Sequence, residues 1–141
     1  MRHVTRTQGW PCWLHRGMAV AGALLIVALL AGSWAIASGV QAASGLAVQE
    51  YRGDRISALM AFAASPAHSL RDRNRAVWAL GQLGDARALT ILEEHETGEP
   101  CDHNRELCQR ELKKAIRLCR GGLNLPALVW RHGPLTHAES S

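Results

Sequence analysis

Four cysteines are the side chains of this 141-residue chain that could form covalent bonds with one another. Cys12 precedes a long apolar run, whereas Cys101, Cys108 and Cys119 follow it. Cys108 and Cys119 are eleven residues apart on one expected helix, a separation of about 16 Å that no disulfide can bridge. Cys101 stands in the loop before that helix and can reach Cys108. We therefore predict a Cys101–Cys108 disulfide, with a Cys101–Cys119 disulfide or three reduced thiols as the alternatives.

The other chemistry that these residue types could support is metal binding and catalysis. Cys101, His103 and Cys108 could supply three zinc ligands, but their spacing matches no common zinc finger. The sequence also lacks a Ser/His/Asp order typical of hydrolases and a glycine-rich phosphate loop. We therefore predict no metal, no cofactor, no small-molecule substrate and no catalytic residue.

A long uncharged segment predicts a membrane helix. No charged side chain occurs from Gly17 through Gln49. Residues 18–40 lie within this run, and about twenty helical residues are enough to cross the ~30 Å hydrocarbon layer. The alternative is a signal peptide cleaved at Ala35-Ile36-Ala37 or Val40-Gln41-Ala42, which would leave a secreted or periplasmic product.

The charge distribution predicts the orientation of that helix. The leader, residues 1–17, contains Arg2, Arg6 and Arg16 and no acidic residue. By the positive-inside rule the leader is cytoplasmic, and the rest of the chain lies outside the cytoplasm. After Ser44 there are thirteen Lys and Arg against twelve Asp and Glu, so most of the net charge of +4 comes from the leader. This balance predicts no nucleic-acid binding.

The rest of the chain has the helical period of apolar residues and predicts an all-α fold. Four helices are expected, at 54–65, 69–84, 86–95 and about 104–120, which form a helical domain over 54–122. Ser69 and Asp72 have the spacing of a capping box, and Gly84-Asp85 can end one helix and cap the next. Residues 41–53 are expected to be a linker, and residues 123–141 a capping segment with a flexible tail.

One stretch of these helices resembles a known family. Residues 73–85, Arg-Asn-Arg-Ala-Val-Trp-Ala-Leu-Gly-Gln-Leu-Gly-Asp, followed by Ala88-Leu89 and Ile91-Leu92, resemble the short HEAT repeats known as phycobilisome-lyase HEAT-like repeats. The resemblance is good over residues 73–92 and loose over 54–119, because the last helix lacks the Ala-Leu-Gly core. It implies stacked helical hairpins that bind proteins. Some family members modify chromophores, so it also implies a lyase-like accessory enzyme as an alternative.

A stack of two repeats has ends that something must cover. Residues 54–59 and 85–89 are weakly similar, at a spacing of about thirty residues that is typical of helical solenoids. About three such repeats are usually needed for independent stability, and this chain is expected to have two. The cover could come from the run that contains Leu123, Leu125, Leu128, Val129 and Trp130, from residues 46–51, or from a partner.

Eight side chains form the predicted partner-binding surface. Trp78 either packs on a neighbouring helix or inserts into a partner, and the basic side chains are either solvated or contact acidic headgroups or an acidic protein. The eight are Arg71, Arg75, Trp78 and Gln82 on the second helix, and Arg110, Lys113, Lys114 and Arg117 on the fourth. Together these features predict a non-enzymatic, membrane-tethered interaction module that binds another envelope or membrane protein. An assembly factor for a membrane complex is a further alternative.

Overall fold

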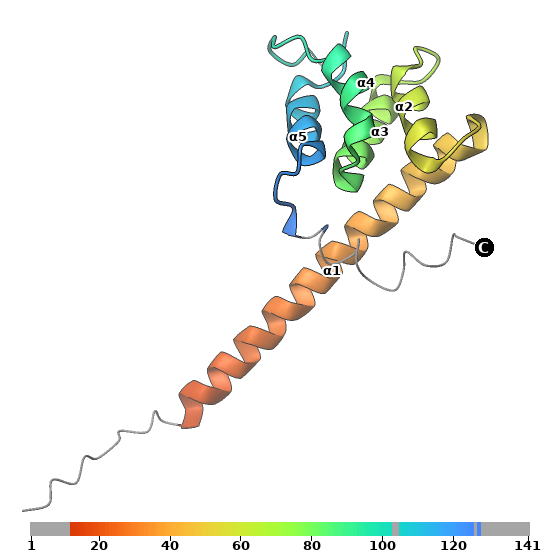
Figure 1. Cartoon of the computed structure of the whole chain (residues 1–141). Coiled ribbons are helices and arrows are strands. Elements are labelled where there is room, and N and C mark those ends of the chain that lie inside the picture. The colour runs from red at the N-terminus through yellow and green to blue at the C-terminus, as the bar shows by residue number, and fades with distance from the viewer. Residues whose placement is uncertain (1–11, 103–104, 126, 128–141) are drawn as a thin grey trace, which may run out of the picture.

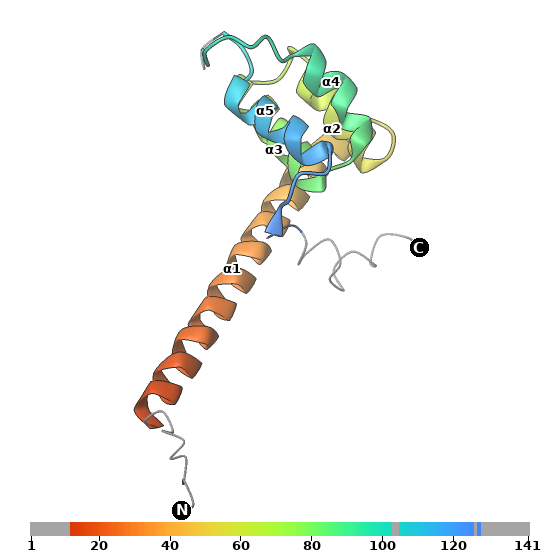
Figure 2. The same cartoon turned by 60° about the vertical axis from the view of Figure 1, so that its left-hand side comes forward.

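The structure is a computed structural model that describes residues 12–102, 105–125 and 127 (Figures 1 and 2). Among these residues it contains helices and no strand, so the predicted all-α class is confirmed. The elements are α1 (Cys12–Glu50), α2 (Arg55–Ala64), α3 (Leu70–Leu83), a short 3₁₀-helix η1 (Ala86–Ala88), α4 (Leu89–Glu94) and α5 (Gln109–Cys119). Helix α1 projects from a bundle that the other helices form (Figure 1).

Helix α1 is divided into an exposed half and a packed half. Its first half exposes large apolar side chains from Met18 to Trp34. Its second half buries a stripe at helical spacing, formed by Ala37, Val40, Ala43 and Ala47, against α2 and α3. The segment expected to be a linker, 41–53, is therefore helical as far as Glu50. The physical reason is that small apolar residues three and four apart give this half a face that α2 and α3 can cover.

The junction between α1 and α2 is held by a cluster of aromatic rings. The hydroxyl of Tyr51 lies 3.1 Å from Nε2 of His68, and the His68 ring stacks on Phe62 with centroids 3.7 Å apart. Nε2 of His68 also lies 3.4 Å from a carboxylate oxygen of Glu50. These contacts fasten the end of α1 to the turn between α2 and α3.

Helices α2 and α3 begin and end within one residue of the positions that the sequence predicts. Ser69 is the N-cap of α3, the first half of the expected capping box, since its Oγ accepts from the Asp72 amide at 3.2 Å. The Asp72 carboxylate accepts from the Ser69 hydroxyl at 2.6 Å. Arg73 closes the preceding helix, because its Nε donates to the carbonyl oxygen of Ala63 at 2.7 Å. Helix α3 ends at Gly84, whose φ of 66° is the left-handed conformation that glycine adopts without strain.

The last two helices are shorter than expected. The segment 86–95 divides into η1 and α4. Helix α5 begins at Gln109 rather than near residue 104, because the amides of Arg105 and Glu106 both donate to the Asp102 carbonyl and form a turn first. Cys108 is consequently the N-cap of α5, and its own amide donates to Oδ1 of Asn74 at 2.8 Å.

The core is centred on α3. The fully buried leucines Leu59, Leu80, Leu92 and Leu112 come from four different helices, α2 to α5. Helices α3 and α5 approach closely at Gly81, where an added Cβ would lie 2.8 Å from Cα of Ala115. Only a residue without a side chain fits this crossing. The second half of α1 packs on α2 and α3, so this side of the stack is covered by the chain itself, including Ala47 of the candidate segment 46–51.

Candidate functional site

A groove runs between α3 and α5. It consists of two adjoining pockets of about 570 and 420 Å³, which share the lining residues Arg71, Asn74 and Glu111. The first pocket is completed by Cys101, Cys108 and Arg110, and the second by Arg75, Trp78 and Lys114. We call this surface the α3/α5 groove.

The groove contains five of the eight side chains predicted to bind a partner: Arg71, Arg75, Trp78, Arg110 and Lys114. Its lining has four cationic side chains and one acidic side chain, Glu111. Part of each expected face, one on each helix, therefore contributes to a single surface with an excess of positive charge. Such a surface favours a negatively charged partner.

The structure places the other three predicted side chains elsewhere. Lys113 and Arg117 line a separate hollow between α4 and α5, in which Nζ of Lys113 lies 3.7 Å from a carboxylate oxygen of Glu96. Gln82 is buried, and its Oε1 accepts from Nδ2 of Asn124 at 2.8 Å. Gln82 is therefore not on the exposed face on which the sequence places it, and its amide contacts the segment that follows α5.

Trp78 packs within the molecule along one edge of its ring. A Cβ added at Gly39 of α1 would lie 3.0 Å from Cη2 and 3.3 Å from Cζ3 of the indole. The indole is half-buried, packs against the core and also lines the α3/α5 groove. Of the two roles that the sequence leaves open, packing on a neighbouring helix is the one for which the structure shows contacts.

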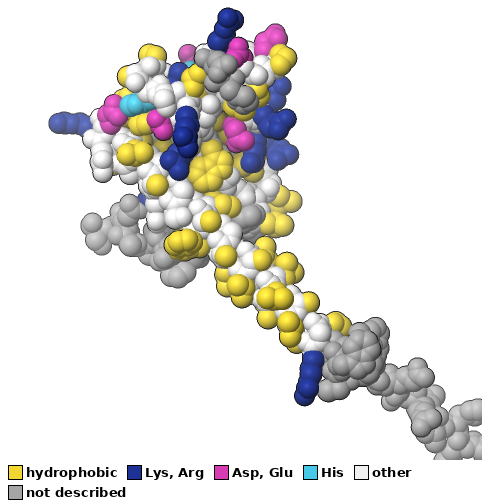
Figure 3. Space-filling view, turned by 180° about the vertical axis from the view of Figure 1, so that it is seen from behind, with side chains coloured by type: hydrophobic (Ala, Val, Ile, Leu, Met, Phe, Trp, Pro, Cys, Tyr) yellow, Lys and Arg dark blue, Asp and Glu magenta, His cyan; other side chains and the backbone are white. Residues whose placement is uncertain are grey.

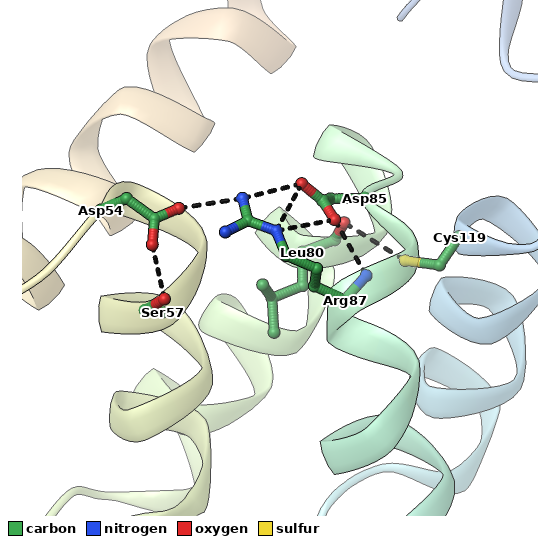
Figure 4. A network of polar contacts seen from close by, with 6 residues as sticks. All are labelled: Asp54, Ser57, Leu80, Asp85, Arg87 and Cys119. Carbon is green, nitrogen blue, oxygen red and sulfur yellow. Dashed lines mark hydrogen bonds and ion pairs between the residues drawn. The ribbon is translucent and has the colours of Figure 1, made fainter.

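Cys101 and Cys108 lie together at one end of the groove. Their sulfur atoms are 3.3 Å apart as two thiols. The Arg110 amide donates to the Cys101 sulfur at 3.2 Å. This bond lowers the pKa of the Cys101 thiol, and the hydrogen bond with Cys108 lowers it further. Cys119 is remote from the pair, and its thiol donates to the Leu80 carbonyl oxygen at 3.6 Å (Figure 4).

Two buried or half-buried amide side chains position the loop that carries Cys101. Gln109 accepts from the Thr97 amide at 2.9 Å and donates to the His95 carbonyl oxygen at 3.2 Å. Asn74 of α3 holds the start of α5 through the Cys108 amide. The sequence could not predict these hydrogen bonds, because the side chains of Gln109 and Asn74 bond to backbone groups of distant segments.

An exposed ion-pair network joins the two weakly similar segments. Nη2 of Arg87 lies 2.9 Å from the carboxylate of Asp54 and 2.9 Å from that of Asp85 (Figure 4). Asp54 also accepts from the Ser57 hydroxyl at 2.5 Å. The Ser57 bond and then Arg87 lower the pKa of Asp54 to about 2. The sequence places both aspartates before helices, but that one arginine joins them is evident only in the structure.

A zinc site needs three or four His, Cys, Asp or Glu side chains close together. Among the described residues no group of three or more His, Cys, Asp and Glu side chains is arranged to hold a metal ion. His103, the third ligand of the zinc site considered from the sequence, lies outside the described residues, as do Leu128, Val129 and Trp130.

The comparisons with known proteins agree with the sequence resemblance. Residues 72–95 match the family model described as PBS lyase HEAT-like repeat. Comparison with curated proteins and with solved structures gives no match. The matched residues cover most of α3 together with η1 and α4. The segment that forms one wall of the α3/α5 groove is thus similar to a PBS lyase HEAT-like repeat.

Proposed function

We propose that this protein is a non-enzymatic, membrane-tethered helical-repeat module that binds an acidic segment of another envelope protein in the α3/α5 groove. The observation that carries the proposal is the division of α1 into an exposed apolar half and a half that packs on α2 and α3. It makes one helix both the membrane anchor and the first helix of the domain.

The dimensions of the exposed half fit a bilayer. By length and composition, α1 is the one helix among the described residues that could cross a membrane. Arg16 and Trp34 are separated by about 27 Å along a helix axis, close to the ~30 Å of the hydrocarbon layer. A cationic side chain and an indole are the types that favour the two membrane interfaces. Figure 3 shows apolar side chains along this part of α1 and charged ones gathered on the domain.

The packing of α1 argues against cleavage of the anchor. Both candidate cleavage sites, 35–37 and 40–42, lie inside α1 next to buried residues such as Val40. A cut after residue 42 would remove Gly39 and Val40 and expose the indole of Trp78. We infer that the mature protein retains α1 and that no flexible linker separates the domain from the membrane surface.

The side of the membrane follows from the leader. Arginines without acids before α1 favour a cytoplasmic N-terminus, which places the domain on the outer face of the cytoplasmic membrane. Alkaline phosphatase fused after Ser141 should then be active, and a fluorescent protein that folds only in the cytoplasm should stay dark. The reverse pattern would exclude this orientation.

The segment that follows α5 supports close contact with the membrane. It extends from the domain toward the first half of α1 in both views (Figures 1 and 2). Leu123 and Leu125 on this segment are 91% and 67% exposed. Two large apolar side chains on the side of the domain that faces the bilayer would lie at the headgroup region rather than in water.

The experiment that tests the binding surface compares two double variants, each of which removes two positive charges. Arg75→Gln with Lys114→Gln removes two positive charges from the groove, whereas Lys113→Gln with Arg117→Gln removes two from the hollow beside α4. Each pair is crosslinked in intact membranes, and the captured proteins are identified by mass spectrometry. We expect the groove pair to lose a defined envelope protein that the control pair retains. Equal recovery from both pairs would refute the groove as the binding surface.

A further inference from the structure

The end of the α3/α5 groove combines two thiols with positive charge. The sulfurs of Cys101 and Cys108 are 3.3 Å apart and line a pocket of about 570 Å³ together with Arg71 and Arg110. Cys101 is half-buried, whereas Cys108 is 8% exposed. Cys101 is therefore the more accessible of the two cysteines that line this pocket.

The hydrogen bonds around the pair favour the thiolate form of Cys101. The Arg110 amide, in the first turn of the eleven-residue helix α5, donates to this sulfur at 3.2 Å. The amide of Cys108 is already engaged by Asn74. Amides at a helix N-terminus carry partial positive charge, which stabilises a nearby anion. The lowered pKa of Cys101 agrees with this arrangement.

We propose that Cys101 and Cys108 are a reversible dithiol–disulfide couple that exchanges with anionic peptide disulfides, and that Cys101 is the attacking sulfur. Arg71 and Arg110 would attract the carboxylates of such a peptide to the pocket. The proposal goes beyond partner binding and does not depend on the membrane anchor. It differs from a structural disulfide because the pair remains open to exchange in the folded protein.

Glutathione disulfide would oxidise the cysteine pair in two exchange steps. The Cys101 thiolate attacks one sulfur of the disulfide, and a protein–glutathione bond forms as the first glutathione thiolate leaves. Cys108 then loses its proton and attacks the Cys101 sulfur, and the second glutathione thiolate leaves. The two protein thiols are oxidised to one disulfide, and glutathione disulfide is reduced to two thiols that take up the two protons.

The test follows these intermediates in the full-length chain in detergent. Reduced protein is mixed with glutathione disulfide, quenched with acid and digested with trypsin, which separates the two cysteines at Arg105. The wild type should yield linked Cys101 and Cys108 peptides. Cys108→Ser should accumulate glutathione on Cys101, and it should keep the fold because serine is a favoured N-cap residue. Cys101→Ser should react with glutathione disulfide at about one tenth of the rate of Cys108→Ser, or more slowly still.

Two controls separate this chemistry from simple accessibility. Cystamine, a cationic disulfide, should react with Cys108→Ser more slowly than glutathione disulfide does. Adding Arg71→Gln to Cys108→Ser should reduce the difference between these two reaction rates. Circular dichroism of every variant checks that the fold is retained. The proposal is overturned if Cys108 or Cys119 is modified before Cys101, or if the wild type remains a dithiol at every ratio of glutathione to its disulfide.

Discussion

The indole of Trp78 lies over Gly39, so that α3 contacts α1 at a residue without a side chain. A Cβ at position 39 would stand 3.0 Å from the ring. This contact joins the segment similar to a HEAT-like repeat to the helix that contains the apolar span. Displacing it should weaken the packing of α3 on α1, while the contacts of Ala37, Val40, Ala43 and Ala47 remain.

Substitution of Gly39 tests this contact directly. Gly39→Leu should lower the free energy of unfolding by about 1–3 kcal/mol, because the new side chain overpacks against Trp78. Gly45→Leu is the matched control, since a Cβ at that position meets no atom within 4 Å. The control should leave stability unchanged or raise it slightly, as leucine is the better helix former. Thermal unfolding in detergent, followed by circular dichroism, measures both. Equal melting temperatures for the two variants would disprove the contact.

Truncation of Trp78 separates packing from binding. Trp78→Ala should cost about 2 kcal/mol of stability, less than the ~3–5 kcal/mol of a fully buried aromatic side chain, because the indole is only half-buried. Arg75→Ala, at an exposed position one turn away, should leave the melting temperature unchanged and reduce recovery of the partner. A Trp78→Ala protein that melts like the wild type would show that the indole serves the partner alone.

The ion-pair network predicts a specific pH dependence. The pKa of Asp54 falls from 3.8 to about 2 in the folded state, so its contribution to stability is present above pH 3.8 and is lost as the pH falls toward 2. Both Ser57→Ala and Arg87→Gln should raise the pKa of Asp54. Arg87→Gln alone should also raise the pKa of Asp85, which the Arg87 bond holds below its usual value.

Carboxyl NMR titration of the two aspartates measures these shifts. In Arg87→Gln, the loss of stability between pH 3.8 and 2 should be smaller than in the wild type, because the Asp54 pKa lies nearer its unfolded value. If the pKa of Asp85 responds to Ser57→Ala as strongly as to Arg87→Gln, the network is not organised as the structure indicates.

The ends of α3 can be predicted from the sequence because residues at or next to each helix end determine them. The N-cap at Ser69 and the left-handed Gly84 are encoded within a few residues, and both are confirmed. The second role of α1 was missed because its buried residues are as apolar as the exposed ones before them. A usable signal was present in the spacing of Ala37, Val40, Ala43 and Ala47, which marks one helix face.

The candidate site depended more on tertiary contacts. Helical periodicity placed Arg75 and Lys114 on their helices, but only the packing of α3 on α5 brings them to one groove. Periodicity also placed Gln82 on the polar side of its helix, where the segment containing Asn124 folds back and buries it. A contact between residues 42 positions apart leaves no mark in a single sequence.

The intact mass and N-terminal residue of the protein from carbonate-washed membranes show whether α1 is retained in the mature chain. If α1 is both the anchor and the first helix of the domain, the membrane fraction contains the chain with residues 18–50 intact, and the soluble fraction contains none. A soluble product that begins at Ser38 or Ala43 would contradict this arrangement, because either cut would divide α1 before the last residues that pack on α2 and α3.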